Sequence, residues 1–316
     1  MLQELVGSGR PVLADAGVET RIRFETQLEL DPHVQAAGLL ERRSGRDALR
    51  TIYAEDLAVA AAHGLPAILG TPTFRASRRY VERAGSGGAD AVRRLNVAAV
   101  AFLGEIRAAV DHDPVFVAGV VGPYGEVGRP DDCLNHLDGA EYHAEQIAAL
   151  TEAGADLLFA PSFPSIEEAH GVAIAMAAAE LPYTIGFVLD ERGRVLDGTY
   201  LHTAIDRIDD SVMPAPTYYT ISCVDLDVAR RALTDLAVTS PRGAGRMREL
   251  KANDVGGTAS GRPASLGGAA GAAPEAFGEA MHQLATEFQI PILGGCCGTG
   301  AQHLAALARR LVARTA

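Results

Sequence analysis

The sequence predicts an α/β protein built as a closed (β/α)8 barrel, the TIM barrel architecture, with one domain over residues 1–316. Short apolar runs alternate with longer segments of helical periodicity, which gives about eight strand and helix pairs. The length of 316 residues is typical of a single barrel of this kind. A doubly wound open sheet has the same alternation and stays an alternative.

Each predicted strand is a short apolar run that ends at a polar residue or a glycine, as buried parallel strands do. The first run ends at Asp15 and Gly17, and the second leads to Thr71. The third is rich in β-branched residues and enters the turn signature Gly122-Pro-Tyr-Gly125. The predicted strands cover residues 11–16, 66–70, 115–121, 156–160, 183–188, 216–222, 248–252 and 291–293.

The segments between these strands carry aliphatic residues at helical spacing. Predicted helices cover residues 45–63, 89–110, 140–153, 165–179, 200–208, 227–236, 274–288 and 299–313. Thr299 and Gln302 have the spacing of a capping box for the last helix. Residues 255–273 are rich in glycine and alanine without a period, which predicts a loop able to act as a lid.

Charge and hydropathy exclude several classes of function. A formal net charge of -12 and a pI near 5.2 leave no basic stripe for nucleic acid. We expect a cytoplasmic protein without a membrane partner, because the chain shows neither a signal-peptide pattern nor an apolar run of spanning length. The oligomeric state stays open, a homo-oligomer included.

The cysteines indicate a metal site. Cys296 and Cys297 are adjacent on a glycine-lined turn, where the missing β-carbons allow both sulfurs to approach one zinc ion. A catalytic zinc commonly has three protein ligands, and Cys223 is the best third candidate. The predicted sixth and eighth strands bring Cys223 and the cysteine pair to the same wall of the barrel mouth. Cys133 has no such position, and we expect it to be structural or a bystander.

The order of these motifs is similar to that of a known family. Leu13-Ala-Asp-Ala-Gly17, Val121-Gly-Pro-Tyr-Gly125, Cys223 and Gly294-Gly-Cys-Cys-Gly-Thr299 together resemble the homocysteine S-methyltransferases over nearly the whole chain. The resemblance implies a (β/α)8 barrel that binds zinc through Cys223, Cys296 and Cys297. It also implies methylation of a thiol amino acid, a reaction of methionine biosynthesis, with a small thiol acceptor and a methyl donor as partners.

Several residues depart from the family pattern where the acceptor is expected to bind. The family has an acid followed by threonine after the fourth strand, and this chain has Pro161 and Ser162 there. The acceptor is therefore homocysteine held in an altered way, or a different small thiol. An arginine near the metal, Arg75, offers a planar fork for a substrate carboxylate or is a solvated loop residue. The predicted acceptor-binding residues are Asp15, Gly17, Thr73, Arg75, Tyr124 and Ser162.

The expected reaction is methyl transfer from a sulfonium or ammonium donor: S-methylmethionine, S-adenosylmethionine or a betaine-like compound. No catalytic residue beyond the metal site is predicted, because zinc favours the thiolate form of a bound thiol. Two alternatives remain. One is a metal-free enzyme with a nucleophilic cysteine, for which His303 is the nearest candidate base. The other is a zinc or thiol binding protein without turnover.

Overall fold

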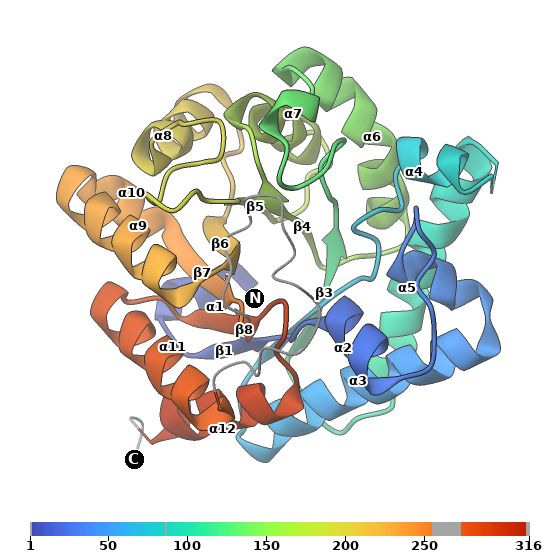
Figure 1. Ribbon diagram of the computed structural model, residues 1–316, viewed down its shortest axis with the longest axis horizontal. Helices are drawn as coiled ribbons and strands as arrows, with labels where there is room; N and C mark the ends of the chain where they lie inside the picture. Colours follow the sequence, from blue (N-terminus) through green and yellow to red (C-terminus); the bar gives the residue numbers. More distant parts are fainter. Residues whose placement is uncertain (1, 86, 255–272, 314–316) are drawn as a thin grey trace.

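Eight parallel strands close into a barrel in chain order in the computed structural model, which describes residues 2–85, 87–254 and 273–313 (Figure 1). The last strand pairs with the first in parallel, so the sheet has no open edge. The strands are β1 Val12–Ala14, β2 Ala67–Gly70, β3 Val115–Val120, β4 Leu157–Phe163, β5 Tyr183–Phe187, β6 Tyr218–Val224, β7 Met247–Ala252 and β8 Ile292–Gly295. This closure confirms the predicted (β/α)8 fold and excludes the open sheet.

Helices surround the barrel, and the main apolar core lies between them and the outer faces of the strands (Figure 1). The α-helices of the described residues are α1 Leu2–Ser8, α2 Val18–Glu25, α3 Arg43–Ala62, α4 Arg78–Arg83, α5 Ala89–Ala108, α6 His136–Glu152, α7 Ile166–Ala177, α8 Leu201–Ser211, α9 Leu226–Thr239, α10 Pro241–Arg246, α11 Pro274–Phe288 and α12 Ala301–Val312. Two 3-10 helices, η1 Ala36–Glu41 and η2 Pro130–Asp132, lie in loops. None of these described helices is both long and apolar enough to cross a bilayer.

A second apolar cluster fills the barrel interior with alternate residues of the strands. It includes Ala14, Phe116, Phe159 and Tyr218, and α1 adds Leu2 at the N-terminal end of the barrel. Because side chains alternate along a strand, the inward positions of β7 are Glu249 and Lys251. The interior therefore becomes polar toward the ends where β6, β7 and β8 lead into the loops.

The predicted strands all occur, and the differences lie at their ends and in short helices. β4 runs three residues beyond its predicted end, to Phe163, and β6 continues through Cys223 to Val224. The short helices α1, α2, α4 and α10 were not predicted, because segments of six to eight residues give too few turns for a clear apolar period. Of the loop predicted over 255–273, all but the last residue lies outside the described residues.

Candidate metal and acceptor site

The fold brings the three predicted cysteines together at the C-terminal end of the barrel. The sulfur atoms of Cys223, Cys296 and Cys297 all lie within 4.8 Å of one another. The sulfurs of Cys223 and Cys296 are 2.7 Å apart. Cys223 comes from the end of β6, and the adjacent pair directly follows β8. We call this group of three sulfurs the sulfur cluster. Cys133 follows η2 in the loop between β3 and α6 and does not belong to the cluster.

Two strands leave regular geometry where they approach the sulfur cluster. The register of β6 against β7 shifts between Ser222 and Val224, and Cys223 has a φ of 53°. β4 has a similar irregularity, where Ser162 has a φ of 63°. Left-handed backbone is uncommon for residues with a β-carbon, and such bulges redirect a side chain. The Ser162 hydroxyl lies near the Cys223 sulfur, so both irregularities direct their side chains to one place.

The end of β7 holds the backbone of the cysteine pair from one side. The Cys296 N–H donates to the Ala252 carbonyl at 2.8 Å, and the Cys297 N–H donates to Asn253 Oδ1 at 3.1 Å. In return, the Asp254 N–H donates to the Cys297 carbonyl at 3.0 Å. The last residue of β7 and the two residues after it thus fix the two cysteines in place. Asn253 was missed in the sequence, although it directly follows a predicted strand.

The loop after β1 holds the same cysteines from the other side. A β-carbon on Gly17 would overlap the carbonyl oxygen of Cys296, so this contact needs glycine. The Gly17 N–H donates to the Thr299 hydroxyl at 3.2 Å, and that hydroxyl donates to the Cys296 carbonyl at 2.7 Å. The Gly298 N–H donates to the Thr20 hydroxyl at 3.2 Å. Gly17 therefore supports the sulfur cluster by close backbone approach.

The predicted capping box of the last helix is wrong. Thr299 serves the cysteine loop, and α12 begins one residue after Gly300. The imidazole of His303 accepts the Gly300 N–H through Nδ1 at 3.1 Å, and its Nε2 lies 3.0 Å from Asp254 Oδ2. His303 is thus engaged with the helix start and with the residue that contacts Cys297. Neither of these two bonds goes to a thiol, whereas the base of a nucleophilic cysteine would bond the thiol.

The three thiols share their protons unequally. Hydrogen bonds from Cys223 and then Cys297 lower the pKa of Cys296 well below its ordinary value, with help from the nearby Lys251 cation. Hydrogen bonding with Cys296 raises the pKa of Cys223, and hydrogen bonding with Cys223 and then Cys296 raises the pKa of Cys297. The cluster therefore favours a thiolate at Cys296, and thiolate sulfur is a donor that a soft divalent cation prefers.

Asp15 closes β1 and lies beside the sulfur cluster as half of a buried ion pair. One carboxylate oxygen pairs with the ammonium of Lys251, and the other accepts the Gly70 N–H at 2.8 Å. The Asp15 residue is only 5% exposed. Burial alone lowers the pKa of Lys251, but the carboxylates of Asp15 and Glu249 outweigh it, and the pKa is raised. The barrel thus contains a permanent cation, Lys251, which was not among the predicted site residues.

Thr73 and Arg75 both have protein partners. The Thr73 hydroxyl is fully buried and donates to the Val120 carbonyl at 2.7 Å. The Arg75 guanidinium pairs with Glu126 and stacks over the ring of Tyr80, 4.5 Å from its centroid. Arg75 is therefore a half-buried, paired residue and not a solvated one. A role for either residue in acceptor binding stays a prediction.

Tyr124 faces an outer cleft of about 450 Å³. Its ring lies under the Arg79 guanidinium at 4.2 Å and against the edge of Tyr142. Its N–H donates to the buried Glu168 carboxylate at 2.6 Å, which fixes the Gly-Pro-Tyr-Gly turn. The residues that line the cleft are Arg78, Arg79, Glu82, Arg83, Tyr124 and Tyr142. Acceptor binding by Tyr124 likewise stays a prediction.

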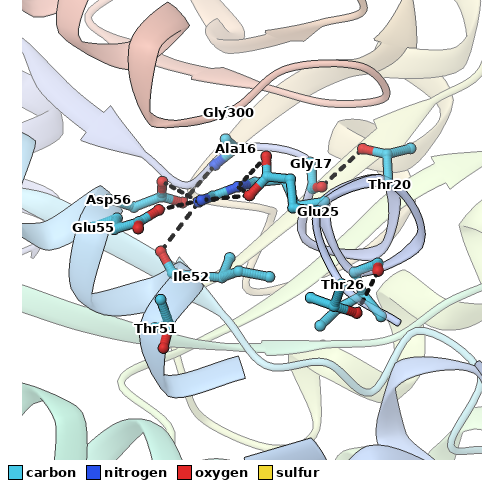
Figure 2. Close-up of polar contacts among 12 residues, drawn as sticks. Ala16, Gly17, Thr20, Glu25, Thr26, Thr51, Ile52, Glu55, Asp56 and Gly300 are labelled. Atoms are coloured by element: carbon cyan, nitrogen blue, oxygen red, sulfur yellow. Dashed lines mark hydrogen bonds and ion pairs between the residues drawn. The ribbon is translucent and has the colours of Figure 1, made fainter. Parts of the chain in front are cut away.

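A buried arginine supports the β1 loop from behind. Arg21 is 4% exposed and contacts the carboxylates of Glu25, Glu55 and Asp56, which Figure 2 shows gathered around one guanidinium. Asp56 also accepts the N–H of Ala16 at 3.1 Å. This network joins α2 and α3 to the residue between Asp15 and Gly17, and so indirectly to the cysteine loop.

Comparisons with known proteins give a family match and a structural likeness. The family model described as homocysteine S-methyltransferase matches residues 12–311. The metallated form of the homocysteine methyltransferase MmuM from Escherichia coli superimposes with a TM-score of 0.78 at 20% identity, covering 98% of this chain and 99% of that one. Its oxidized form gives a TM-score of 0.75 at 21% identity, covering 95% and 96%. No curated protein sequence matches.

The structural likeness shows a shared barrel, and the family match extends from the first residue of β1 to the end of the last helix. The matched region contains the three clustered cysteines and the loops that hold them. The chain belongs to the homocysteine S-methyltransferase family, and it is a methyltransferase enzyme.

Proposed function

We propose that this protein is a zinc-dependent S-methyltransferase whose metal ligands are Cys223, Cys296 and Cys297. The observation that carries the proposal is the sulfur cluster, in which all three sulfurs lie within 4.8 Å of one another. Tetrahedral zinc with Zn–S bonds of about 2.3 Å separates its sulfurs by about 3.8 Å. The cluster therefore needs only small side-chain adjustments to bind the ion.

The chemistry of the donor set supports the same proposal. Thiolates are soft ligands, and three of them leave one tetrahedral position for a substrate sulfur. Bound zinc would supply stabilisation of a thiolate at neutral pH. The related Escherichia coli enzyme was solved in a metallated form, which also favours a metal at this site.

The protein itself would bind, orient and shield the reactants. Asn253 and the Ala252 carbonyl fix the cysteine backbone, and Ser162 orients the Cys223 sulfur. The acceptor thiol releases its proton to solvent, and its sulfur forms a bond to the methyl carbon while the bond from that carbon to the sulfonium sulfur or ammonium nitrogen of the donor breaks. The donor keeps that electron pair and leaves as a neutral sulfide or amine. S-methylmethionine, S-adenosylmethionine and a betaine-like compound are the candidate donors, and homocysteine or a related small thiol is the candidate acceptor.

Metal content and product formation test the proposal separately. We expect about one zinc per chain in the purified protein, and loss of zinc in the Cys223→Ser, Cys296→Ser and Cys297→Ser variants. Cys133→Ser is the matched control, because Cys133 lies outside the sulfur cluster, and it should keep both zinc and activity. Mass spectrometry of a thiol panel with each donor should detect the methylated sulfide.

Each failure has a distinct meaning. A metal-free protein that still transfers methyl groups would exclude zinc and favour a nucleophilic cysteine. A protein that binds zinc but methylates none of the panel with any donor would favour a binding protein without turnover.

A further inference from the structure

Lys251 is the single lysine among the 28 lysine and arginine residues of the chain. All the others are arginines, and many of them form ion pairs on the surface. The one lysine lies inside the barrel, on an inward position of β7, with its side chain 11% exposed. An ammonium is a compact charge with three N–H donors, whereas a guanidinium is a larger planar fork. The one lysine is therefore placed where a compact buried cation is required.

Lys251 lies beside the sulfur cluster. In the sheet its Cα is in register with Ser222 of β6 and with Gly294 of β8, the residues that shortly precede Cys223 and Cys296. Adjacent strands are about 4.8 Å apart, so the lysine projects from the wall between the two sources of the cysteines. Its ammonium lies 5.9 Å from the centroid of Phe159, across the interior.

The ammonium has unused hydrogen-bonding capacity. Within the parts of the chain that the structure describes, its one hydrogen-bond partner is Asp15. Two of its three N–H donors are thus available to a ligand, and a buried cation favours an anionic one.

The same ion pair disfavours a cationic group at Asp15. An incoming ammonium would have to displace Lys251 from Asp15 and leave the buried lysine without its hydrogen-bonded carboxylate, which is unfavourable. The end of β4 supplies no substitute carboxylate, because Pro161 and Ser162 are uncharged. Glu19, a further carboxylate near Cys296, already accepts the Ala36 N–H.

We propose that Lys251 binds the carboxylate of the thiol acceptor, so that the enzyme recognises a mercapto-carboxylate by its carboxylate and not by an α-amino group. Asp15 is then a positioning residue that orients the Lys251 ammonium. The inference rests on the proposed methyltransferase function, because it assigns a binding residue to the carboxylate of an acceptor whose sulfur would bind at the cysteine site.

Four acceptors separate the two polar groups of homocysteine: homocysteine, 4-mercaptobutyrate without the amino group, 3-aminopropane-1-thiol without the carboxylate, and propane-1-thiol without either. With the zinc-loaded enzyme, loss of the carboxylate should lower kcat/KM by about 10- to 100-fold, the worth of one charged hydrogen bond. Loss of the amino group should change it by less than about threefold, within the effect of an exposed polar group.

A direct binding readout does not depend on turnover. Because the chain has one lysine, labelling with lysine carrying 15N at Nζ gives one side-chain NMR signal that needs no assignment. We expect this signal to move on addition of 4-mercaptobutyrate or homocysteine and to stay in place with 3-aminopropane-1-thiol. A signal that moves equally with the aminothiol, or with none of the acceptors, would overturn the inference.

Variants complete the test. Lys251→Met should remove the preference for carboxylate acceptors, and Lys251→Arg should retain part of it. Because Lys251→Met leaves Asp15 without its partner, the double variant Asp15→Asn/Lys251→Met removes both charges and serves if the single variant unfolds. A carboxylate preference that survives in the folded, zinc-bound double variant would contradict the assignment.

The two proposals fail differently. Methylation of the aminothiol as efficiently as of the mercapto acid would refute the role of Lys251 and leave the methyltransferase standing. Movement of the lysine signal by 4-mercaptobutyrate without any methylated product would refute the methyltransferase and leave the carboxylate site standing.

Discussion

Gly17 and Cys296 are in direct backbone contact: the carbonyl oxygen of Cys296 occupies the space that a β-carbon on Gly17 would need. One residue of the β1 loop is therefore fixed by the position of a predicted metal ligand 279 residues later in the chain. Close approach of this kind tolerates no added carbon unless the cysteine loop moves.

Gly17→Ala should therefore weaken metal binding more than it weakens the fold. We expect the affinity for zinc to fall at least about tenfold, in line with other changes that displace ligand supports. Competition with a chelator measures this directly. Gly104→Ala is the control, because a β-carbon there meets nothing within 4 Å, and it should leave zinc affinity unchanged. Equal affinities in the two variants would show that the contact is dispensable.

Asn253 should matter through its side-chain oxygen. Asn253→Ala removes the acceptor of the Cys297 N–H, and we expect a loss of about 10- to 100-fold in zinc affinity. Asn253→Asp keeps an oxygen in the same place and should retain most of the affinity. If the alanine variant binds zinc like the unchanged protein, the Ala252 carbonyl and the contacts from Asp254 and Thr299 hold the cysteine loop adequately without Asn253.

Glu249 makes the protein less stable as the pH rises. Burial raises its pKa from 4.5 to about 7, and its Oε2 has no hydrogen-bond partner among the described residues. Because the folded state holds this proton more tightly, the associated stability is complete below pH 4.5 and is lost as the pH rises to 7. Glu249→Gln should therefore be more stable by roughly 2 to 3 kcal/mol at pH 8.

The gain from Glu249→Gln should shrink toward zero as the pH falls below 4.5, where the carboxyl becomes protonated in both states. Denaturant unfolding at a series of pH values measures the difference. Glu141→Gln, at an exposed position of α6, is the control and should leave the pH dependence unchanged. A gain that is constant across pH would mean that the charge of Glu249 is not its source.

Arg21 should be a large determinant of stability. Arg21→Met leaves Asp56, which is 3% exposed, without its cation, and we expect a loss of about 3 to 5 kcal/mol at pH 8. Burial already raises the pKa of Asp56 to about 7, against the influence of Arg21. The loss should be smaller at pH 5, because protonation then removes the unpaired charge.

Unfolding curves at the two pH values test the role of Arg21. Glu25→Gln changes a half-exposed partner of the same guanidinium and should cost less than about 1 kcal/mol. A loss for Arg21→Met that is equal at both pH values would assign its effect to packing.

The sequence predicted those features that depend on the regular alternation of strands and helices. Cys223 and the Cys296 pair follow apolar runs, and parallel strands bring their ends to one mouth. The sulfur cluster was therefore predictable from strand order. By contrast, Asn253 and Thr299 act through contacts between loops, which no periodicity encodes.

Lys251 shows a different limit. It is the last residue but one of a strand that also contains Arg248 and Glu249, and that strand lacks the apolar pattern of a buried one. Its burial depends on pairing with Asp15, more than two hundred residues away in sequence. The sequence shows that it is the one lysine of the chain, but only its position in the barrel indicates a role for it.

The attachment of both cysteines to the end of β7 has a consequence for how the site is lost. Ala252 and Asn253 hydrogen-bond the backbone of Cys296 and Cys297, so local unfolding at this end of β7 would release the cysteine loop in the same event. Dissociation of a bound metal ion and local unfolding at the end of β7 would then occur at the same rate. Hydrogen exchange at the Cys296 and Cys297 amides would report both.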